Sequence, residues 1–155
     1  MRAGSLRSMS AMSVTKMPLH SAATEREILV VDDDHDIRET LGALLESEGY
    51  RVRLAENGEV ALEALRRQPK PDLMLLDLMM PVLSGFELLE MLEDGDPDLG
   101  AVPIFVVSAF NAPLTPDRGA GGVKRCFGKP FDPDALLMAV RDCLAESPIA
   151  SPQTG

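Results

Sequence analysis

The chain contains three short runs of consecutive apolar residues, each followed directly by polar side chains. The runs are residues 28–31 (ILVV), 73–76 (LMLL) and 104–107 (IFVV). An uninterrupted apolar run of this length, bounded by polar residues, is typical of a strand that is buried on both faces of a parallel sheet. Such a sheet needs helices on both sides to cover it. The three runs therefore favour an α/β architecture.

The segments between these runs have apolar residues at helical spacing. This pattern predicts helices around residues 37–45, 60–65, 86–92 and 136–144. Alternation of Tyr50, Val52 and Leu54 with arginines predicts a further strand, and residues 126–127 could form a short fifth one. With right-handed crossovers, this order predicts an open, doubly wound, five-stranded parallel sheet with helices on both faces.

The segment between the fourth and fifth strands has an unusual composition for a helix. Residues 111–122 contain two prolines and three glycines. Proline and glycine are the weakest helix formers. We therefore expect the fourth helix of the alternating pattern to be short or distorted.

The two ends of the chain differ from its middle. Residues 1–25 are rich in Ser, Met and Ala without an apolar period, which predicts a disordered extension. Their basic, Ser-rich character also resembles a transit peptide, although an upstream start codon or a flexible tail is the simpler interpretation. Residues 147–155 contain two prolines and predict a flexible tail. The single folded domain is expected at residues 26–146.

Composition excludes several classes of function. A net charge of −10 argues against a nucleic-acid partner, which would need a basic patch. No segment approaches the ~18 apolar residues of a membrane span. Two cysteines cannot form a disulfide framework, and their separation fits no zinc motif. We therefore expect a soluble, cytoplasmic protein that binds neither nucleic acid nor membranes.

Polar side chains follow the strands of the predicted sheet. Asp32 and Asp33 follow the first strand, Asp77 the third, Ser108 the fourth and Lys129 the fifth. Ligands of open parallel sheets bind at the carboxyl ends of the strands, so these side chains should gather there. Carboxylates that share a small site repel one another unless a cation joins them, and oxygen ligands suit Mg²⁺. A lysine and a hydroxyl opposite would stabilise a phosphoryl group on a nucleophilic carboxylate, for which Asp77 is the best candidate.

With these motifs in this order, the chain resembles the receiver domain of two-component response regulators, the CheY-like family with a flavodoxin-like fold. The resemblance covers about residues 26–146. The matching motifs are residues 28–34, 75–81, 85–87, 107–109 and 128–131.

The resemblance implies a role for each site residue. Asp77 corresponds to the phospho-acceptor. The Mg²⁺ ligands would be Asp33, Asp77 and the backbone carbonyl of Met79, with Asp32 acting through water. Ser108 corresponds to the switch hydroxyl and Lys129 to the lysine that pairs with the phosphoryl group. The bond from this lysine to the following proline is expected to be cis.

The function implied is that of a single-domain response regulator rather than an enzyme. A sensor histidine kinase or a phosphotransfer protein would phosphorylate Asp77, and an unidentified downstream protein would read the result. Catalysis would be limited to self-catalysed phosphotransfer and slow autodephosphorylation. Met79 and Phe110 occupy positions that, in the family, border the path of the hydrolytic water. Both side chains are bulky and apolar, so we expect slow loss of the phosphoryl group.

Two features depart from the family or allow other interpretations. Cys126 stands where the family has an aromatic residue that moves with the switch hydroxyl, so this coupling is in doubt here. The chain could therefore also be a pseudo-receiver, which has the same fold but binds a partner without phosphorylation. We expect Cys126 and Cys143 to be small hydrophobes in or near the core. Asp32 and Asp34 form an Asp-x-Asp pair like that of haloacid-dehalogenase-type phosphatases, although the chain is short for that fold with a cap.

Overall fold

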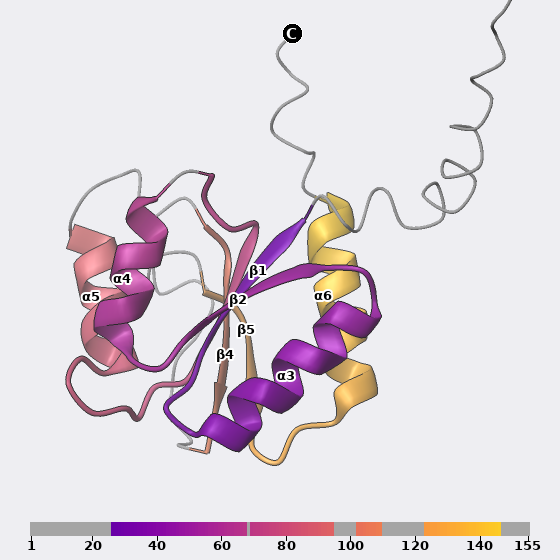
Figure 1. The fold of residues 1–155 in the computed structure, drawn as a ribbon, viewed down its shortest axis with the longest axis horizontal. Helices are drawn as coiled ribbons and strands as arrows, with labels where there is room; N and C mark the ends of the chain where they lie inside the picture. Colours follow the sequence, from indigo (N-terminus) through magenta and orange to yellow (C-terminus); the bar gives the residue numbers. More distant parts are fainter. Residues whose placement is uncertain (1–25, 68, 95–101, 110–122, 147–155) are drawn as a thin grey trace, which may run out of the picture.

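The computed structural model describes residues 26–67, 69–94, 102–109 and 123–146, which form a parallel sheet covered by helices (Figure 1). Five strands are joined in the order β2-β1-β3-β4-β5, and every pair is parallel. The strands are β1 (Glu27–Val31), β2 (Arg51–Ala55), β3 (Leu73–Leu76), β4 (Ile104–Ser108) and β5 (Val123–Gly128). This order confirms the predicted open, doubly wound sheet.

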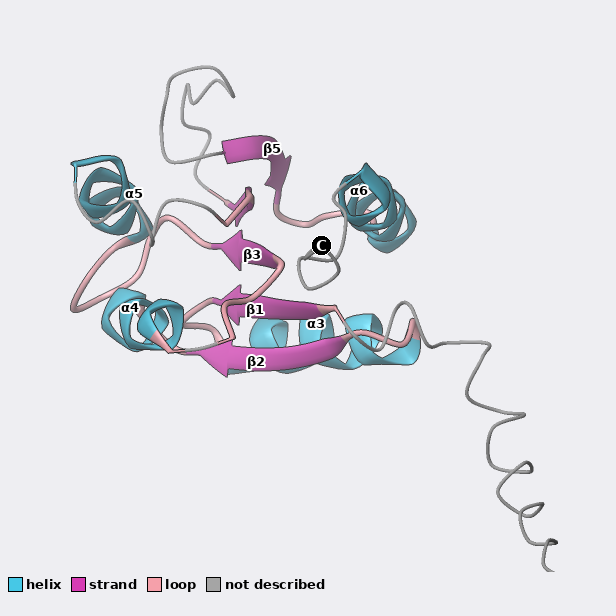
Figure 2. Cartoon of the chain, turned by 90° about the horizontal axis from the view of Figure 1, so that it is seen from above, coloured by secondary structure: helices cyan, strands magenta, loops and turns pink. Residues whose placement is uncertain are grey.

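Helices cover both faces of the sheet. They are α3 (His35–Ser47), α4 (Gly58–Arg66), α5 (Gly85–Asp94) and α6 (Pro133–Glu146). Figure 1 shows α4 and α5 on one side of the sheet and α3 and α6 on the other, and the view from above shows α4 and α5 together and α6 across the sheet from them (Figure 2). Within the residues that the structure describes, no helix combines the length and apolar character needed to cross a membrane. The predicted disordered ends and the predicted distorted helix at residues 111–122 lie outside the described residues.

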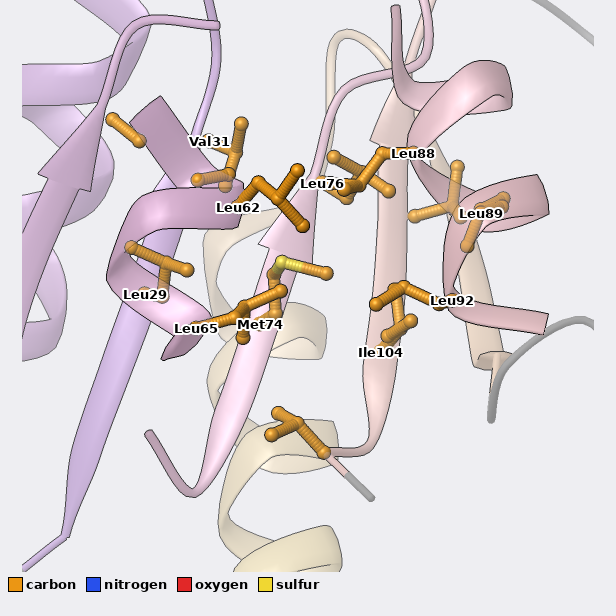
Figure 3. Packing of buried hydrophobic residues seen from close by; sticks show 14 of the residues in the cluster. Leu29, Val31, Leu62, Leu65, Met74, Leu76, Leu88, Leu89, Leu92 and Ile104 are labelled. Atoms are coloured by element: carbon orange, nitrogen blue, oxygen red, sulfur yellow. The ribbon is translucent and has the colours of Figure 1, made fainter. Parts of the chain in front are cut away.

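The central strands divide their side chains between two cores. Leu29 and Val31 of β1 pack with α4 and α5, whereas Ile28 and Val30 of the same strand pack with α3 and α6. Figure 3 shows the first core, where leucines of α4 and α5 meet side chains of β1, β3 and β4. Burying each such side chain contributes about 1.5–3 kcal/mol. The uninterrupted apolar runs of the sequence follow from this two-sided burial.

Three helices begin at the carboxyl edge of the sheet with side-chain caps. Asp34 accepts hydrogen bonds from the backbone of the first turn of α3, and Asn57 accepts one from Val60 N of α4. Before α5, Ser84 N donates to Glu87 Oε1 at 2.8 Å and Glu87 N donates to Ser84 Oγ at 3.1 Å, which forms a capping box. These caps set where each helix starts relative to the strand ends.

The edge strand β5 differs from its prediction. It runs over six residues rather than two, and Cys126 is exposed, whereas we expected it in or near the core. The ring of Phe127 does point inward and lies 5.8 Å from the ring of Phe105. Cys143 is half-buried against the α3–α6 core. Alternation along an edge strand puts only every second side chain into this core, so Cys126 faces away from it.

The loop from β3 to α5 is held by close contacts with glycines. Gly58 N donates to Leu83 O at 3.0 Å, and a Cβ atom at Gly58 would lie 2.5 Å from that oxygen. The loop also contains a tight turn in which Leu83 N donates to Pro81 O at 2.8 Å, with Val82 at φ 70°. A positive φ in a β-branched residue costs on the order of 1–3 kcal/mol. Surrounding contacts therefore hold this loop in an unfavourable conformation.

We predict that Gly58→Ala lowers the free energy of unfolding by about 1–3 kcal/mol, because the added methyl group collides with backbone that cannot move aside. Gly42→Ala in α3 is the matched control. There the new Cβ would meet the end of the Leu54 side chain at 3.3 Å, and a helix interior gains from alanine. Urea unfolding of both variants checks this. Equal stability of the two variants would contradict the close-contact account.

Candidate functional site

Three carboxylates meet at the carboxyl edge of the central strands. Asp32 and Asp33 follow β1, and Asp77 follows the neighbouring strand β3. One oxygen from each carboxylate lies within 4.8 Å of the others. Asp32 and Asp77 are 1% and 5% exposed, whereas Asp33 is exposed. Two of the carboxylates are thus inside the protein, and the third faces solvent.

One ammonium group lies against this cluster. Lys129 Nζ is 2.7 Å from Asp32 Oδ2 and 3.4 Å from Asp77 Oδ2. The backbone N of Lys129 donates to Ser108 O at 3.2 Å, which ties the end of β5 to the end of β4. The bond between Lys129 and Pro130 is cis, as expected from the resemblance. Lys129 therefore contacts both buried carboxylates while its backbone is held by the neighbouring strand.

Backbone groups orient the two buried carboxylates. Asp34 N donates to Asp32 Oδ1 at 2.9 Å, and Met79 N donates to Asp77 Oδ1 at 3.3 Å. Asp77 N itself donates to Val31 O at 2.9 Å, which extends the sheet by one bond beyond β3. The two side-chain bonds are made to Oδ1 of Asp32 and Asp77, whereas Lys129 contacts Oδ2 of each carboxylate.

Gly85 brings the start of α5 against the backbone of Asp77. Its N–H donates to Leu78 O at 3.0 Å, and a Cβ atom at this position would overlap the Asp77 carbonyl oxygen. A larger residue at this position would displace Asp77 or the helix. The glycine thus contributes to the geometry of the site through the backbone alone.

The site carries more negative than positive charge. Burial is the main cause that raises the pKa of Asp32, and the charge of Asp77 adds to it, although the hydrogen bonds from Lys129 and Asp34 N act against it. Burial alone would lower the pKa of Lys129, but the two carboxylates outweigh burial and raise that pKa. The shift of Asp32 thus reflects burial first, and the shift of Lys129 reflects the two buried carboxylates beside it.

This donor set fits a hard divalent cation. Carboxylate oxygens are the ligands that Mg²⁺ prefers, and Mg²⁺ keeps several waters, so few protein ligands suffice. Exposure of Asp33 leaves the cluster accessible from solvent. Asp32, Asp33 and Asp77 together could therefore hold one Mg²⁺ ion, which would offset their mutual repulsion.

The remaining residues expected at the site lie around the same edge. Ser108 ends β4, next to β3, and is 3% exposed. The backbone N of Met79 contacts Asp77, while the Met79 side chain is 56% exposed. Phe110 lies outside the described residues. The structure thus brings Asp32, Asp33, Asp77 and Lys129 together, with Ser108 and Met79 on adjacent segments.

Sequence reasoning missed one residue next to the site. Arg38 Nη1 donates to the backbone oxygen of Asp32 at 2.7 Å. The one sequence feature that could have indicated this contact is the position of Arg38, one turn into the helix that follows the aspartates. Asp34, by contrast, is the N-cap of α3, and its carboxylate accepts hydrogen bonds from Asp36 N and Ile37 N.

Loss of the lysine should destabilise the fold in a pH-dependent manner. We predict that Lys129→Met lowers the free energy of unfolding at neutral pH by about 3 kcal/mol, because buried Asp32 loses its cation. The native pKa of Asp32 is raised, so its contribution to stability is full below its ordinary value of 3.8 and is lost as pH rises through the native pKa. The variant raises this pKa further, so its deficit should shrink as pH falls. Urea unfolding across pH tests this against Lys124→Met, an exposed lysine of β5, and a deficit independent of pH would contradict it.

Known proteins match this chain over most of its described part. The family model for the response regulator receiver domain matches residues 28–141. Protein PilH of Pseudomonas aeruginosa is 36% identical over 119 residues, which are 76% of this chain and 97% of PilH. Response regulator MprA of Mycobacterium leprae is 40% identical over 120 residues, or 76% of this chain, but this chain spans only 50% of MprA.

Solved structures agree with the sequence matches. The receiver domain of the Francisella response regulator 1452 superposes with a TM-score of 0.68 at 27% identity, covering 78% of this chain and 98% of that one. A putative response regulator from Chloroflexus aurantiacus gives 0.66 at 30% identity, covering 77% and 98%. Together with the family match, these similarities show that the chain belongs to the response regulator receiver domains of two-component systems.

Proposed function

We propose that this receiver domain accepts a phosphoryl group on Asp77 from a sensor histidine kinase or a phosphotransfer protein in the cytoplasm. A downstream partner protein then reads the phosphorylated surface. The observation that carries the proposal is the buried Asp77 carboxylate, which has Lys129 Nζ at 3.4 Å and two further carboxylates within 4.8 Å. This combination of a nucleophile, a cation and a metal-binding set suits phosphoryl transfer.

The reaction would proceed by attack of an Asp77 carboxylate oxygen on phosphorus. A P–O bond forms as the P–N bond to the donor histidine breaks, and the imidazole nitrogen keeps the electron pair and later takes a proton. The chain's contribution is to hold the nucleophile in one orientation. Met79 N and the close approach of Gly85 supply this constraint.

A Mg²⁺ ion would be held by Asp33, Asp77 and the backbone carbonyl of Met79, with Asp32 acting through water. When bound, Mg²⁺ would neutralise charge on the phosphoryl oxygens. Asp33 is accessible from solvent, so it can meet an incoming cation without any rearrangement of the core. The surplus negative charge of the cluster favours this binding.

Lys129 and Ser108 would stabilise the remaining phosphoryl oxygens. The Lys129 ammonium already lies between two carboxylates, so a phosphoryl group on Asp77 would add a second strong partner for it. The Ser108 hydroxyl could donate to another oxygen. Because Lys129 N bonds Ser108 O, movement at either residue would also move the ends of β4 and β5. We propose this movement as the signal to the partner protein.

A pseudo-receiver is the second candidate, and the exposed Cys126 favours it. The cysteine replaces an aromatic residue that the family uses to couple the switch hydroxyl to the surface. A receiver that lacks this coupling could serve as a binding module without phosphorylation. A phosphorylation assay distinguishes a phosphorylated receiver from a pseudo-receiver directly.

We predict that the full chain, incubated with acetyl phosphate and Mg²⁺, gains the mass of one phosphoryl group. Asp77→Asn should abolish the gain, whereas Asp36→Asn, an exposed acid in the first turn of α3, should retain it. Intact-protein mass spectrometry with and without EDTA makes the measurement. No gain in the wild type would support the pseudo-receiver, and continuous hydrolysis of a phosphate monoester would point to a phosphatase.

A second prediction concerns the lifetime of the phosphorylated state. If the bulky Met79 side chain limits access of water to the phosphoryl group, Met79→Asn should shorten the half-life severalfold. The control is Met138→Asn on α6, which is exposed to the same 56%. The decay of phosphorylated protein after removal of the donor gives the rate. Identical decay in both variants would show that Met79 does not exclude water.

A further inference from the structure

Arg38 has no role in the proposed phosphoryl transfer, yet its side chain contacts the backbone of the acidic cluster. It lies in the first turns of α3, and its side chain is partly buried. Nη1 donates to Asp32 O at 2.7 Å, and Nη2 lies 3.3 Å from His35 Nδ1. A bond of 2.7 Å is at the short end of the range for N–H···O, as expected when the donor is charged.

The bond from Arg38 lies just beyond the hydrogen-bonded pairing of β1, which ends one residue earlier. The register of β1 with both neighbouring strands runs to Val31. Asp32 N still bonds Ala55 O at 3.1 Å, but the Asp32 carbonyl belongs to the peptide group that leads into Asp33. Arg38 holds the oxygen of this peptide group, so it limits rotation of the peptide plane.

Asp33 differs from the other two carboxylates in its support. Asp32 and Asp77 each have a backbone N–H donor and contact Lys129. Among the residues that the structure describes, none donates a hydrogen bond to the Asp33 carboxylate or pairs with it. Its direction therefore depends on the backbone to which it is attached. Metal ligands usually rely on outer partners to fix them, and such partners affect metal affinity strongly.

We propose that Arg38 is a positioning residue for the Mg²⁺ site. By holding the Asp32 carbonyl, it fixes the peptide group that carries Asp33 and directs the Asp33 carboxylate toward Asp32 and Asp77. This inference rests on the proposed Mg²⁺ site, and it assigns the outer support of Asp33 to a residue on α3.

The direction in which Mg²⁺ affinity changes when Arg38 is replaced distinguishes a positioning role from a purely electrostatic one. Arg38 is a cation close to a site for a cation, so its charge opposes Mg²⁺ binding. Removal of the charge alone would strengthen binding. Removal of a positioning hydrogen bond would weaken it, because Asp33 would sample orientations outside the cluster. The two interpretations thus predict opposite changes in affinity.

The test compares the Mg²⁺ affinity of full-length variants by isothermal titration calorimetry. Arg38→Met keeps length and helix propensity but removes the donor, and we expect the dissociation constant to rise about 10-fold or more. Arg38→Lys retains a donor and the charge, so it should recover part of the affinity. Arg66→Met, which removes an exposed cation from the last turn of α4, is the matched control and should leave the affinity unchanged.

The possible results distinguish failure of the positioning role of Arg38 from failure of the proposed Mg²⁺ site. Unchanged or tighter Mg²⁺ binding by Arg38→Met would overturn the positioning role while leaving the metal site intact. Failure of Arg38→Lys to bind better than Arg38→Met would also overturn it. Absence of Mg²⁺ binding by the wild type would contradict the proposed site itself. Urea unfolding in EDTA establishes that each variant is folded, and Arg38→Lys against the wild type provides the comparison if Arg38→Met does not fold.

Discussion

The Lys129 ammonium lies 2.7 Å from the Asp32 carboxylate, and this ion pair joins residues 97 positions apart in the sequence. It connects the end of the interior strand β1 with the segment that follows the edge strand β5. Without it, Asp32 would be a buried carboxylate with no cation, which is among the costliest arrangements in a protein interior. The single lysine does not balance three carboxylates, however. The fold thus holds a site with surplus negative charge, which a divalent cation would offset.

The framework around this pair is built from short connections and close contacts. The capped helices α3 and α4 start soon after β1 and β2, and a capping box closes the longer loop between β3 and α5. Gly58 and Gly85 let the loop after β3 pass against its neighbours, and Val82 adopts a positive φ within it. Such a loop holds Asp77 in place, as the proposed phosphoryl transfer would require. Pre-set geometry of this kind is what a reaction based on positioning and charge requires.

Residue patterns were enough to predict the sheet and the cluster, because both depend on periodicity and on strand ends. Buried strands give apolar runs, and the carboxyl ends of parallel strands meet at one edge. The extent of β5 could not be predicted in this way, since Lys124 and Arg125 interrupt any apolar run on an edge strand. The exposure of Cys126 follows from the same edge position. The contacts of Gly58 and the bond from Arg38 to Asp32 O depend on tertiary approach, which spacing along the chain does not reveal.

The proposed function requires Asp32, Asp33 and Asp77 to form one cation site at the carboxyl edge of the sheet. Mn²⁺ shares the preference of Mg²⁺ for oxygen ligands and scatters X-rays anomalously. Anomalous diffraction from crystals grown with Mn²⁺ therefore locates the ion directly. The account predicts one strong peak within coordination distance of the Asp33 and Asp77 carboxylates. A peak elsewhere, or no peak at saturating Mn²⁺, would contradict it.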